Sequence, residues 1–256
     1  MSIGSWLEHP LTRGLDIDDP RTISLRRQIV REKAFLRRLY EEWYGAIAAS
    51  LPSATGPVLE LGSGAGFLAD FVPDLIPSEI FPVPGVAAVL DAADLPFRSR
   101  SLRAAAMTNV LHHVPNPRRM LEELARCIRS GGVVSMIEPW VSPWSRFIYR
   151  RLHHELFDPD AREWEWSSSG PLTGANSAQA WILFQRDRTR FERELPQWSI
   201  RSVKPLMPLR YLVSGGITYR ALAPTWTFRS WRRLEGMLAP YGNQLAMFAH
   251  IVLGRT

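Results

Sequence analysis

The run of residues 57–66, PVLELGSGAG, constrains the fold of this chain more than any other stretch. It passes from a short apolar segment, typical of a buried strand, into three glycines at alternate positions, Gly62, Gly64 and Gly66. Because glycine lacks a Cβ, such a turn lets backbone amides approach a ligand closely and aims the start of a following helix at it. The stretch therefore predicts a strand, a tight turn and a helix beginning at GFLADFV, with a small ligand against the turn.

Short apolar runs recur further along and alternate with segments of helical spacing. The runs LIPSE, AAVLDA, RAAAMTN and GVVSMIE predict strands. Between the last two, VPNPRRMLEELARCIRSGG predicts a helix that starts after a proline and stops at two glycines. Strands that alternate with helices indicate a sheet covered on both faces, so we expect an α/β fold with a doubly wound, mostly parallel sheet.

The flanking regions have different character. Residues 20–50 predict one helix capped by Asp19, and the residues after Glu138 form an insertion rich in tryptophan and proline with little periodicity. NSAQAWILFQRDRTRFEREL predicts a return to helix, and QWSIRSVKPLMP and QLAMFAHIVLGR predict strands on either side of the helical TFRSWRRLEGMLAPY. We expect a single domain over residues 1–256, divided into an N-terminal helical cap (1–50), a ligand-binding core (51–139), a lid-like insertion with a helix (140–197) and C-terminal strands with a helix (198–256).

Charge and cysteine usage limit the partners and the compartment. The net charge of +6 would suit nucleic acid, but only Lys33 and Lys204 are lysines, and the arginines are scattered beside acids on predicted helices. The pattern therefore favours solvated helix faces over a nucleic-acid surface. Cys127 is the only cysteine, the N-terminus has no apolar signal region and no apolar run is long enough to span a membrane. These features favour a cytoplasmic protein without an intrachain disulfide.

The glycine spacing excludes two common nucleotide sites. A dinucleotide fingerprint would place its third glycine where Phe67 stands, so a nicotinamide or flavin enzyme is disfavoured. The turn is not followed by a lysine with serine or threonine, so it is no phosphate-binding P-loop either.

The motifs resemble, in their order along the chain, those of the class I S-adenosylmethionine-dependent methyltransferases, in particular the small-molecule branch called methyltransferase type 11. ELGSGAG resembles the E/D-x-G-x-G-x-G loop of that family, and Glu79 in LIPSE stands where the family places an acid on the ribose hydroxyls. Asp91 in VLDAADLPF matches the residue that accepts from the adenine amino group, and Ala92 follows with a backbone amide. MTNVLHHVPNP and RSGGVVSMIEPW resemble the stretches around the fourth and fifth strands.

This resemblance implies a Rossmann-like fold of seven strands and S-adenosyl-L-methionine as the cofactor. It implies a set of cofactor-binding residues: Glu60, Gly62, Ser63, Gly64, Gly66, Glu79, Asp91, Ala92 and Asn109. Ionised carboxylates are strong acceptors for a ribose diol and an exocyclic amine, which agrees with the two strand-end acids. One departure stands out, because IFPVPGVAAVL between Glu79 and Asp91 is too short for the helix that the family usually has there. The adenine pocket should then be more open, or closed by another segment.

The segment after the fourth predicted strand limits the kind of acceptor. It reads Asn109-Val110-Leu111-His112, without the N/D-P-P-Y type of motif found in the amino-methylating branches for nucleic acids and protein glutamine. Cys127 follows Ala125 and Arg126 in a predicted amphipathic helix, so it is interpreted as buried structure and not as a cytosine-methylating nucleophile. No His, Asp or Glu cluster has metal-ligand spacing, so no metal is expected.

The remaining hypothesis is methyl transfer to a small molecule, with an oxygen, nitrogen or carbon acceptor left open. Its candidates for acid/base catalysis are His113 and His154, and its candidates for substrate binding are His112, Tyr149, Arg150 and His153. Arg146, Arg150 and Arg151 could also hold a carboxylate or phosphate. A histidine after a strand is about as often a packing residue as a catalytic one. The alternatives are an RNA methyltransferase and a partner subunit that binds the cofactor without catalysis.

The aromatic-rich insertion, residues 139–176, has two interpretations. It carries paired histidines and paired arginines among tryptophans and follows the fifth predicted strand, so it could be a lid that shields the substrate from water. Its tryptophans could equally extend the core, with the histidines on the surface.

Overall fold

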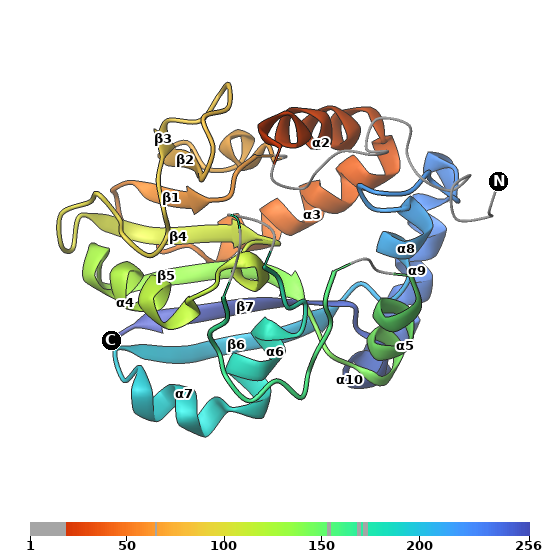
Figure 1. The fold of residues 1–256 in the computed structure, drawn as a ribbon. Coiled ribbons are helices and arrows are strands. Elements are labelled where there is room, and N and C mark those ends of the chain that lie inside the picture. The colour runs from red at the N-terminus through yellow and green to blue at the C-terminus, as the bar shows by residue number, and fades with distance from the viewer. Residues whose placement is uncertain (1–18, 65, 153–154, 168–169, 171–173) are drawn as a thin grey trace.

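The strands form one sheet whose centre is parallel. The computed structural model describes residues 19–64, 66–152, 155–167, 170 and 174–256. Its strands are β1 (Val58–Leu61), β2 (Leu75–Glu79), β3 (Ala88–Val89), β4 (Leu102–Thr108), β5 (Ile128–Pro139), β6 (Trp198–Leu206) and β7 (Phe248–Arg255). They lie in the order β3-β2-β1-β4-β5-β7-β6 (Figure 1), with β7 antiparallel to both of its neighbours. The predicted α/β fold with a mostly parallel seven-stranded sheet is confirmed.

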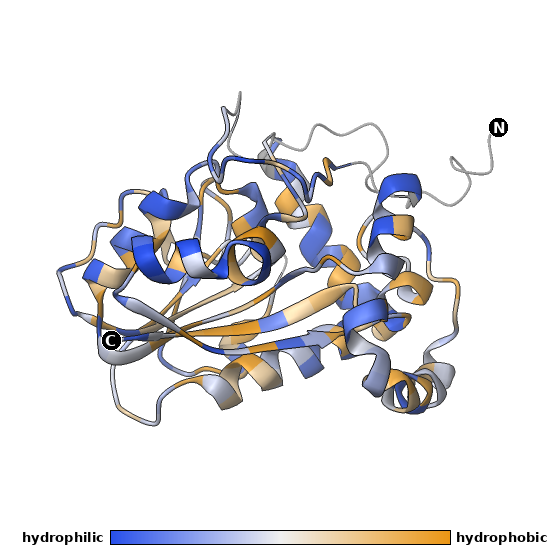
Figure 2. Cartoon of the chain, turned by 90° about the horizontal axis from the view of Figure 1, so that it is seen from below, coloured by the Kyte–Doolittle hydropathy of each residue, from blue (hydrophilic) through white to orange (hydrophobic). Residues whose placement is uncertain are grey.

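The central strands are buried on both faces. All four residues of β1 are buried, and residues 104–107 of β4 have no exposed surface. Parallel strands covered by helices need near-continuous apolar runs, which is what the sequence supplies here. Figure 2 shows the same pattern in colour, with apolar strands inside and polar residues on the outward faces of the helices. The sheet is thus a rigid base on which strand ends can position side chains.

Residues 20–50 form two helices and not the single helix predicted. They are α2 (Pro20–Glu32) and α3 (Ala34–Ser50), and the break falls at Lys33, whose backbone leaves the helical region at φ −80° and ψ 86°. The Lys33 ammonium donates to the carbonyls of Gly216 (2.5 Å) and Tyr219 (2.7 Å), which ties the break to a distant loop. Asp19 caps α2 as predicted, since its side chain accepts from the amide of Arg21.

The prediction of a helix after the glycine turn is wrong. The chain makes only a 3₁₀ turn at Leu68–Asp70 and then enters β2, with Pro73 in the short link between them. The aromatic residues of this link pack against α3 instead, since the rings of Phe67 and Phe71 lie 5.0 and 6.0 Å from that of Tyr44. The absence of a helix between β2 and β3 was predicted from the short spacing, and the residues between them form turns and bends.

The helix before β5 begins where predicted but ends earlier. It is α4 (Pro117–Cys127), capped by Asn116, and the next residue already belongs to β5. The two glycines expected to stop the helix lie inside that strand. A Cβ on Gly132 would lie 2.6 Å from the carbonyl oxygen of Arg103, so glycine is required there by the close approach of β4. Cys127 is buried as predicted, with its sulfur 3.8 Å from the carbonyl oxygen of Phe97, and burial raises the pKa of its thiol.

Short helices complete the fold. The insertion contains a helix that its composition did not predict, α5 (Pro143–Leu152). The helix expected over residues 176–195 is divided into α6 (Gln179–Trp181), a π-helical turn at Ile182–Arg186 and α7 (Arg188–Glu194). The predicted C-terminal helix is α9 (Phe228–Leu238), accompanied by α8 (Arg210–Ser214) and α10 (Gly242–Leu245). Figure 1 shows α5, α8, α9 and α10 gathered beyond one end of the sheet. No helix in the described part of the chain is long and apolar enough to cross a membrane.

Candidate active site

A pocket lies over the carboxyl ends of β1, β2 and β4, where open α/β sheets bind ligands. Most residues predicted to bind the cofactor line it. From that set the lining contains Glu60, Gly62, Gly64, Gly66, Glu79, Asp91, Ala92 and Asn109. Ser63 instead lies beneath the glycine turn, where its hydroxyl donates to the carbonyl of Ser78 over 3.1 Å. The strand order therefore brings together residues that are far apart in the sequence.

The three glycines of the turn are required by the protein's own packing. A Cβ on Gly62 would lie 2.4 Å from a methyl of Val110, and one on Gly64 would lie 2.5 Å from Oε1 of Glu79. A Cβ on Gly66 would lie 2.2 Å from the hydroxyl of Tyr44. Real Cβ atoms do not make such contacts, so the turn reaches this position only without side chains.

Glu79 holds the turn from the end of β2. Its Oε1 accepts from the amide of Gly64 (2.8 Å) and its Oε2 accepts from the amide of Ile80 (3.1 Å). Burial raises the pKa of this carboxyl, against the opposing effect of those two amides. Each carboxylate oxygen has a second lone pair, so both can accept further hydrogen bonds from a ligand.

Asp91 is exposed, and its Oδ1 accepts from the amide of Ala93 over 2.8 Å. This local turn fixes the carboxylate at the mouth of the pocket.

Glu60 lies beneath the same turn and is unusual among the site acids. Its side chain is buried, and burial together with the nearby Glu79 raises its pKa to about 8, although Arg27 opposes this. The carboxyl is therefore mostly protonated at neutral pH. A positive group that arrived in the pocket would favour its ionised form.

The opposite wall of the pocket comes from the N-terminal helices. Ile23 and Arg26 from α2, and Tyr40 and Tyr44 from α3, line it together with Ile217. Tyr40 forms a side-chain hydrogen bond with Asn109, and burial raises the pKa of its phenol to about 12. The sequence predicted a helical cap here but none of these residues. The only local signal was the pair of tyrosines one helical turn apart.

Asn109 ends β4 in the left-handed backbone region, with φ 57°. Asparagine tolerates this conformation better than most residues. The turn that follows is held by Glu138 at the end of β5, whose Oε1 accepts from the amides of Val110 (2.8 Å) and Leu111 (2.9 Å). The buried carboxylate of Glu138 thus fixes the direction in which the chain leaves β4.

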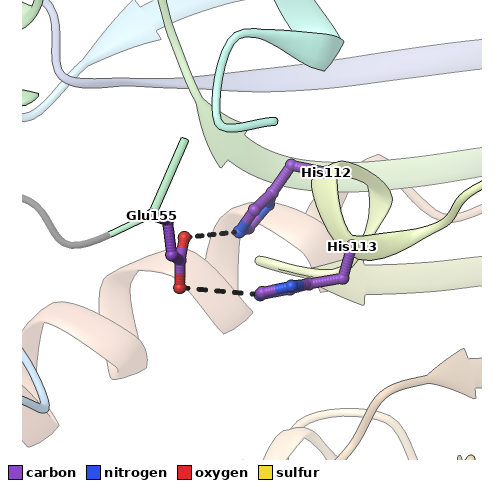
Figure 3. Close-up of side chains that lie close together, drawn as sticks. All are labelled: His112, His113 and Glu155. Atoms are coloured by element: carbon purple, nitrogen blue, oxygen red, sulfur yellow. Dashed lines mark ion pairs between the residues drawn. The ribbon is translucent and has the colours of Figure 1, made fainter. Parts of the chain in front are cut away.

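His112 lies between two acids. Its Nδ1 is 2.7 Å from Oε2 of Glu138, and its Nε2 is 3.5 Å from Oε2 of Glu155 (Figure 3). Burial alone would lower the pKa of this imidazole, but the two carboxylates outweigh burial and raise it to about 9. The two carboxylates thereby stabilise a proton on His112 at neutral pH, which a cation bound between them would displace. His112 is buried beside the pocket and is not part of its lining.

His113, the predicted catalytic residue, does line the pocket. Its Nε2 lies 3.8 Å from Oε1 of Glu155, so the two neighbouring histidines face the same carboxylate (Figure 3). The sequence shows no cluster with metal-ligand spacing, and no metal site was predicted. The structure assembles one from His112, His113 and Glu155, whose ligand atoms all lie within 4.8 Å of one another. Glu155 could not be recognised beforehand because its approach depends on how the insertion folds back.

Tyr149 and Arg150, the other described substrate candidates, do not line the pocket. Tyr149 is buried in the core and its hydroxyl donates to the carbonyl of Met247 over 2.9 Å. Arg150 is exposed on α5. Arg146 lies over the ring of Trp181 and Arg151 over that of Phe147, at 5.8 and 4.0 Å. The candidates His153 and His154 lie outside the described residues.

The described residues of the insertion contact the segment after β4 and do not line the pocket. The amides of Trp166 and Asn176 donate to the carbonyls of Pro115 (3.1 Å) and His112 (2.9 Å), which lie in the segment after β4. None of the described residues from 139 to 176 lines the pocket. Among the described residues, the cover over the glycine turn comes from α2 and α3. The lid-like role of the insertion stays a prediction.

The chain is similar to known methyltransferases in part of its sequence and in its fold. Residues 59–136 match the family model described as a methyltransferase domain. An S-adenosylmethionine-dependent methyltransferase from Thermotoga maritima has 17% identity, with 93% of this chain and 99% of that chain covered and a TM-score of 0.53. Geranyl diphosphate C-methyltransferase from Streptomyces coelicolor A3(2), solved with Mg²⁺, geranyl diphosphate and S-adenosyl-L-homocysteine, has 12% identity, coverage of 98% and 92%, and a TM-score of 0.52. At such identities the likeness to these structures establishes a shared fold.

Proposed function

We propose, from the premise that the chain belongs to the class I S-adenosylmethionine-dependent methyltransferases, that it transfers a methyl group from S-adenosyl-L-methionine to a small-molecule acceptor. One arrangement supports this activity above all. The glycine turn, Glu79 and Asp91 surround a single pocket at the carboxyl ends of the parallel strands. These groups match the donors of a nucleoside, since carboxylates accept from a diol and an amine.

The residues present fit this cofactor in a second respect. Thr108 lines the pocket at the end of β4, and its buried hydroxyl has no hydrogen-bond partner among the described residues. Buried polar groups are nearly always paired, so an unpaired hydroxyl at a pocket wall suits a polar ligand. We assign Glu79 to the ribose hydroxyls and Asp91 to the adenine amine. Arg26 is the pocket cation suited to the methionine carboxylate.

The bound cofactor would supply a methyl group on a positively charged sulfur, open to in-line displacement. The chain's own part is to align the acceptor and to exclude water. The apolar and aromatic wall made by Ile23, Tyr40 and Tyr44 excludes water from the glycine-turn side. His113 lies on the wall after β4 and can assist the loss of a proton from an acceptor hydroxyl or amine.

Calorimetry with S-adenosylmethionine, S-adenosylhomocysteine and NAD tests the cofactor. We expect binding of the two sulfur nucleosides and not of NAD. Asp91→Ala should weaken binding by about 1 to 3 kcal/mol, the range for a charged hydrogen bond, with little loss of stability because Asp91 is exposed. Glu79→Gln should weaken binding and also lower the melting temperature, because Glu79 holds two backbone amides. Binding of NAD alone, or normal affinity in both folded variants, would contradict the assignment.

Transfer of a labelled methyl group identifies the acceptor. The protein is incubated with methyl-labelled cofactor and, in separate reactions, with fractionated small-molecule extract and with total RNA. Label in a small-molecule fraction supports the proposal. Label in RNA alone would favour the RNA methyltransferase, and cofactor binding without label in either sample would favour a non-catalytic partner subunit.

A further inference from the structure

We propose that His112, His113 and Glu155 form a binding site for one divalent transition-metal ion of the zinc class, at the edge of the cofactor pocket. The three ligand atoms come from two segments, the turn after β4 and the residues that follow α5 (Figure 3). They already lie within 4.8 Å of one another. Nε2 of His112 lies 3.5 Å from Oε2 of Glu155, and Nε2 of His113 lies 3.8 Å from Oε1 of the same carboxylate. Ligands about 2.0–2.2 Å from a tetrahedral zinc ion are separated by roughly 3.3–3.5 Å, so small side-chain movements would complete the geometry.

The chemical types of the three ligands determine which metal ions the site would prefer. Two imidazoles and one carboxylate suit zinc, iron and related ions, whereas magnesium and calcium prefer oxygen ligands. Structural zinc sites usually have four protein ligands, while catalytic sites have three and keep a position for water or substrate. The cluster of His112, His113 and Glu155 has the composition of the second kind.

The surroundings of His112 also match a metal site. A metal-ligating histidine usually gives its other ring nitrogen to a carboxylate, which fixes the ring and its tautomer. Glu138 lies in that position, with its Oε2 2.7 Å from Nδ1 of His112. Glu138 is itself held by the amides of Val110 and Leu111. The ring of His112 is therefore oriented by a rigid strand end before any ion arrives, with Nε2 directed at Glu155.

The site has a consequence for the acceptor, which rests on the proposed function. His113 both belongs to the cluster and lines the cofactor pocket, so the open position of the metal would face the region where the methyl group is transferred. A metal-bound hydroxyl releases its proton to solvent more readily than a free one. Its oxygen then forms the new bond to the methyl carbon while the carbon–sulfur bond breaks and its electron pair goes to sulfur. The inferred acceptor is therefore a hydroxyl-bearing small molecule.

Metal binding can be measured without knowing the acceptor. Untagged protein is stripped with a chelator and titrated with Zn²⁺ by calorimetry and with Co²⁺ by visible absorption. We expect one ion per chain, with Co²⁺ bands typical of a low-coordinate site, and no comparable binding of Mg²⁺. His113→Ala and Glu155→Gln should each reduce Zn²⁺ affinity by at least about tenfold, since even outer-shell changes have effects of that size. Glu163→Gln, at an exposed acid of the same insertion, is the matched control and should bind normally.

The failures of the two proposals can be told apart. Absence of Zn²⁺ and Co²⁺ binding to the wild-type protein, or equal binding in His113→Ala, Glu155→Gln and Glu163→Gln, overturns the metal site. Circular dichroism of the metal-free variants confirms that they are folded, and Glu155→Gln keeps the size of the side chain. If S-adenosylmethionine binds and the metal does not, only the metal site is refuted. If the metal binds and the cofactor does not, only the proposed function is refuted.

Discussion

Glu60, which lies beneath the glycine turn, connects cofactor binding to the protonation state of the protein. The elevated pKa of Glu60, about 8, arises from burial and from the neighbouring Glu79. A raised pKa in a folded acid means that the folded state binds more protons than the unfolded one. Its contribution to stability is therefore complete below the unfolded value of 4.5 and is lost as the pH rises towards 8.

Binding of a cationic cofactor should reverse this effect. We expect S-adenosylmethionine to favour the ionised form of Glu60, so that binding at pH 7 releases protons and affinity increases with pH up to about 8. Calorimetry in buffers with different ionisation enthalpies measures the released protons. Glu60→Gln should abolish most of the release. Proton release that is unchanged in this variant would assign the effect to another group.

At the scale of elements, Arg27 connects α2 to the site through two hydrogen bonds. Arg27 donates to the carbonyl of Gly64 in the glycine turn (2.9 Å) and to that of Pro84 in the link between β2 and β3 (2.6 Å). This link lacks the helix that usually follows the second strand, so α2 closes the region instead. Ile23 and Arg26 of the same helix line the pocket.

Arg27→Met should therefore loosen α2 and weaken cofactor binding by about 1 kcal/mol, because it removes hydrogen bonds while keeping most of the side-chain volume. Hydrogen exchange should become faster in α2 and around Gly64. Arg31→Met on the exposed face of α2 is the control and should change neither property. If exchange and affinity in Arg27→Met equal those of the control, α2 is held by its apolar contacts alone.

At the scale of the whole molecule, a chain of hydrogen-bonded polar side chains joins the neighbouring strands β7 and β5 to helix α3. His250 on β7 lies with its Nε2 2.9 Å from the hydroxyl of Ser135 on β5, and the hydroxyl of Ser50 on α3 donates to Ser135 over 2.8 Å. Burial, assisted by Lys204, lowers the pKa of His250 to about 4. The imidazole is thus neutral in the folded protein at pH values where the unfolded chain would already be protonated.

Acid should then destabilise the protein through this residue. With an unfolded pKa of 6.5 and a folded pKa of about 4, stability falls as the pH decreases between these values, by up to about 3 kcal/mol. Above pH 6.5 the residue has no effect on the pH dependence. Urea unfolding at several pH values measures this slope, which should be flatter in His250→Gln between pH 6.5 and 4. An equally steep slope in the variant would assign the acid sensitivity to other groups.

The residues at the strand ends of the site could be predicted from the sequence, but those of its walls could not. The sheet and the residues at its carboxyl edge were predictable, because Glu60, Glu79 and Asp91 follow apolar runs whose order fixes the edge at which they meet. Tyr40 and Glu155 were not, because their approach to the site depends on the packing of distant segments. The helix after the glycine turn was also predicted wrongly, since local spacing did not show that Phe67 and Phe71 would pack against α3.

Because Cys127 is buried, site-specific probes can be attached to this protein at cysteines introduced elsewhere. It is the only thiol, it has no exposed surface and burial raises its pKa, so it should react slowly with maleimides. A cysteine introduced at an exposed position, such as Met237 on α9, would then carry the only fluorophore or spin label. Paired with a second introduced cysteine on α2, it would report the separation between the pocket wall and the C-terminal helices as ligands bind, without replacement of the native cysteine.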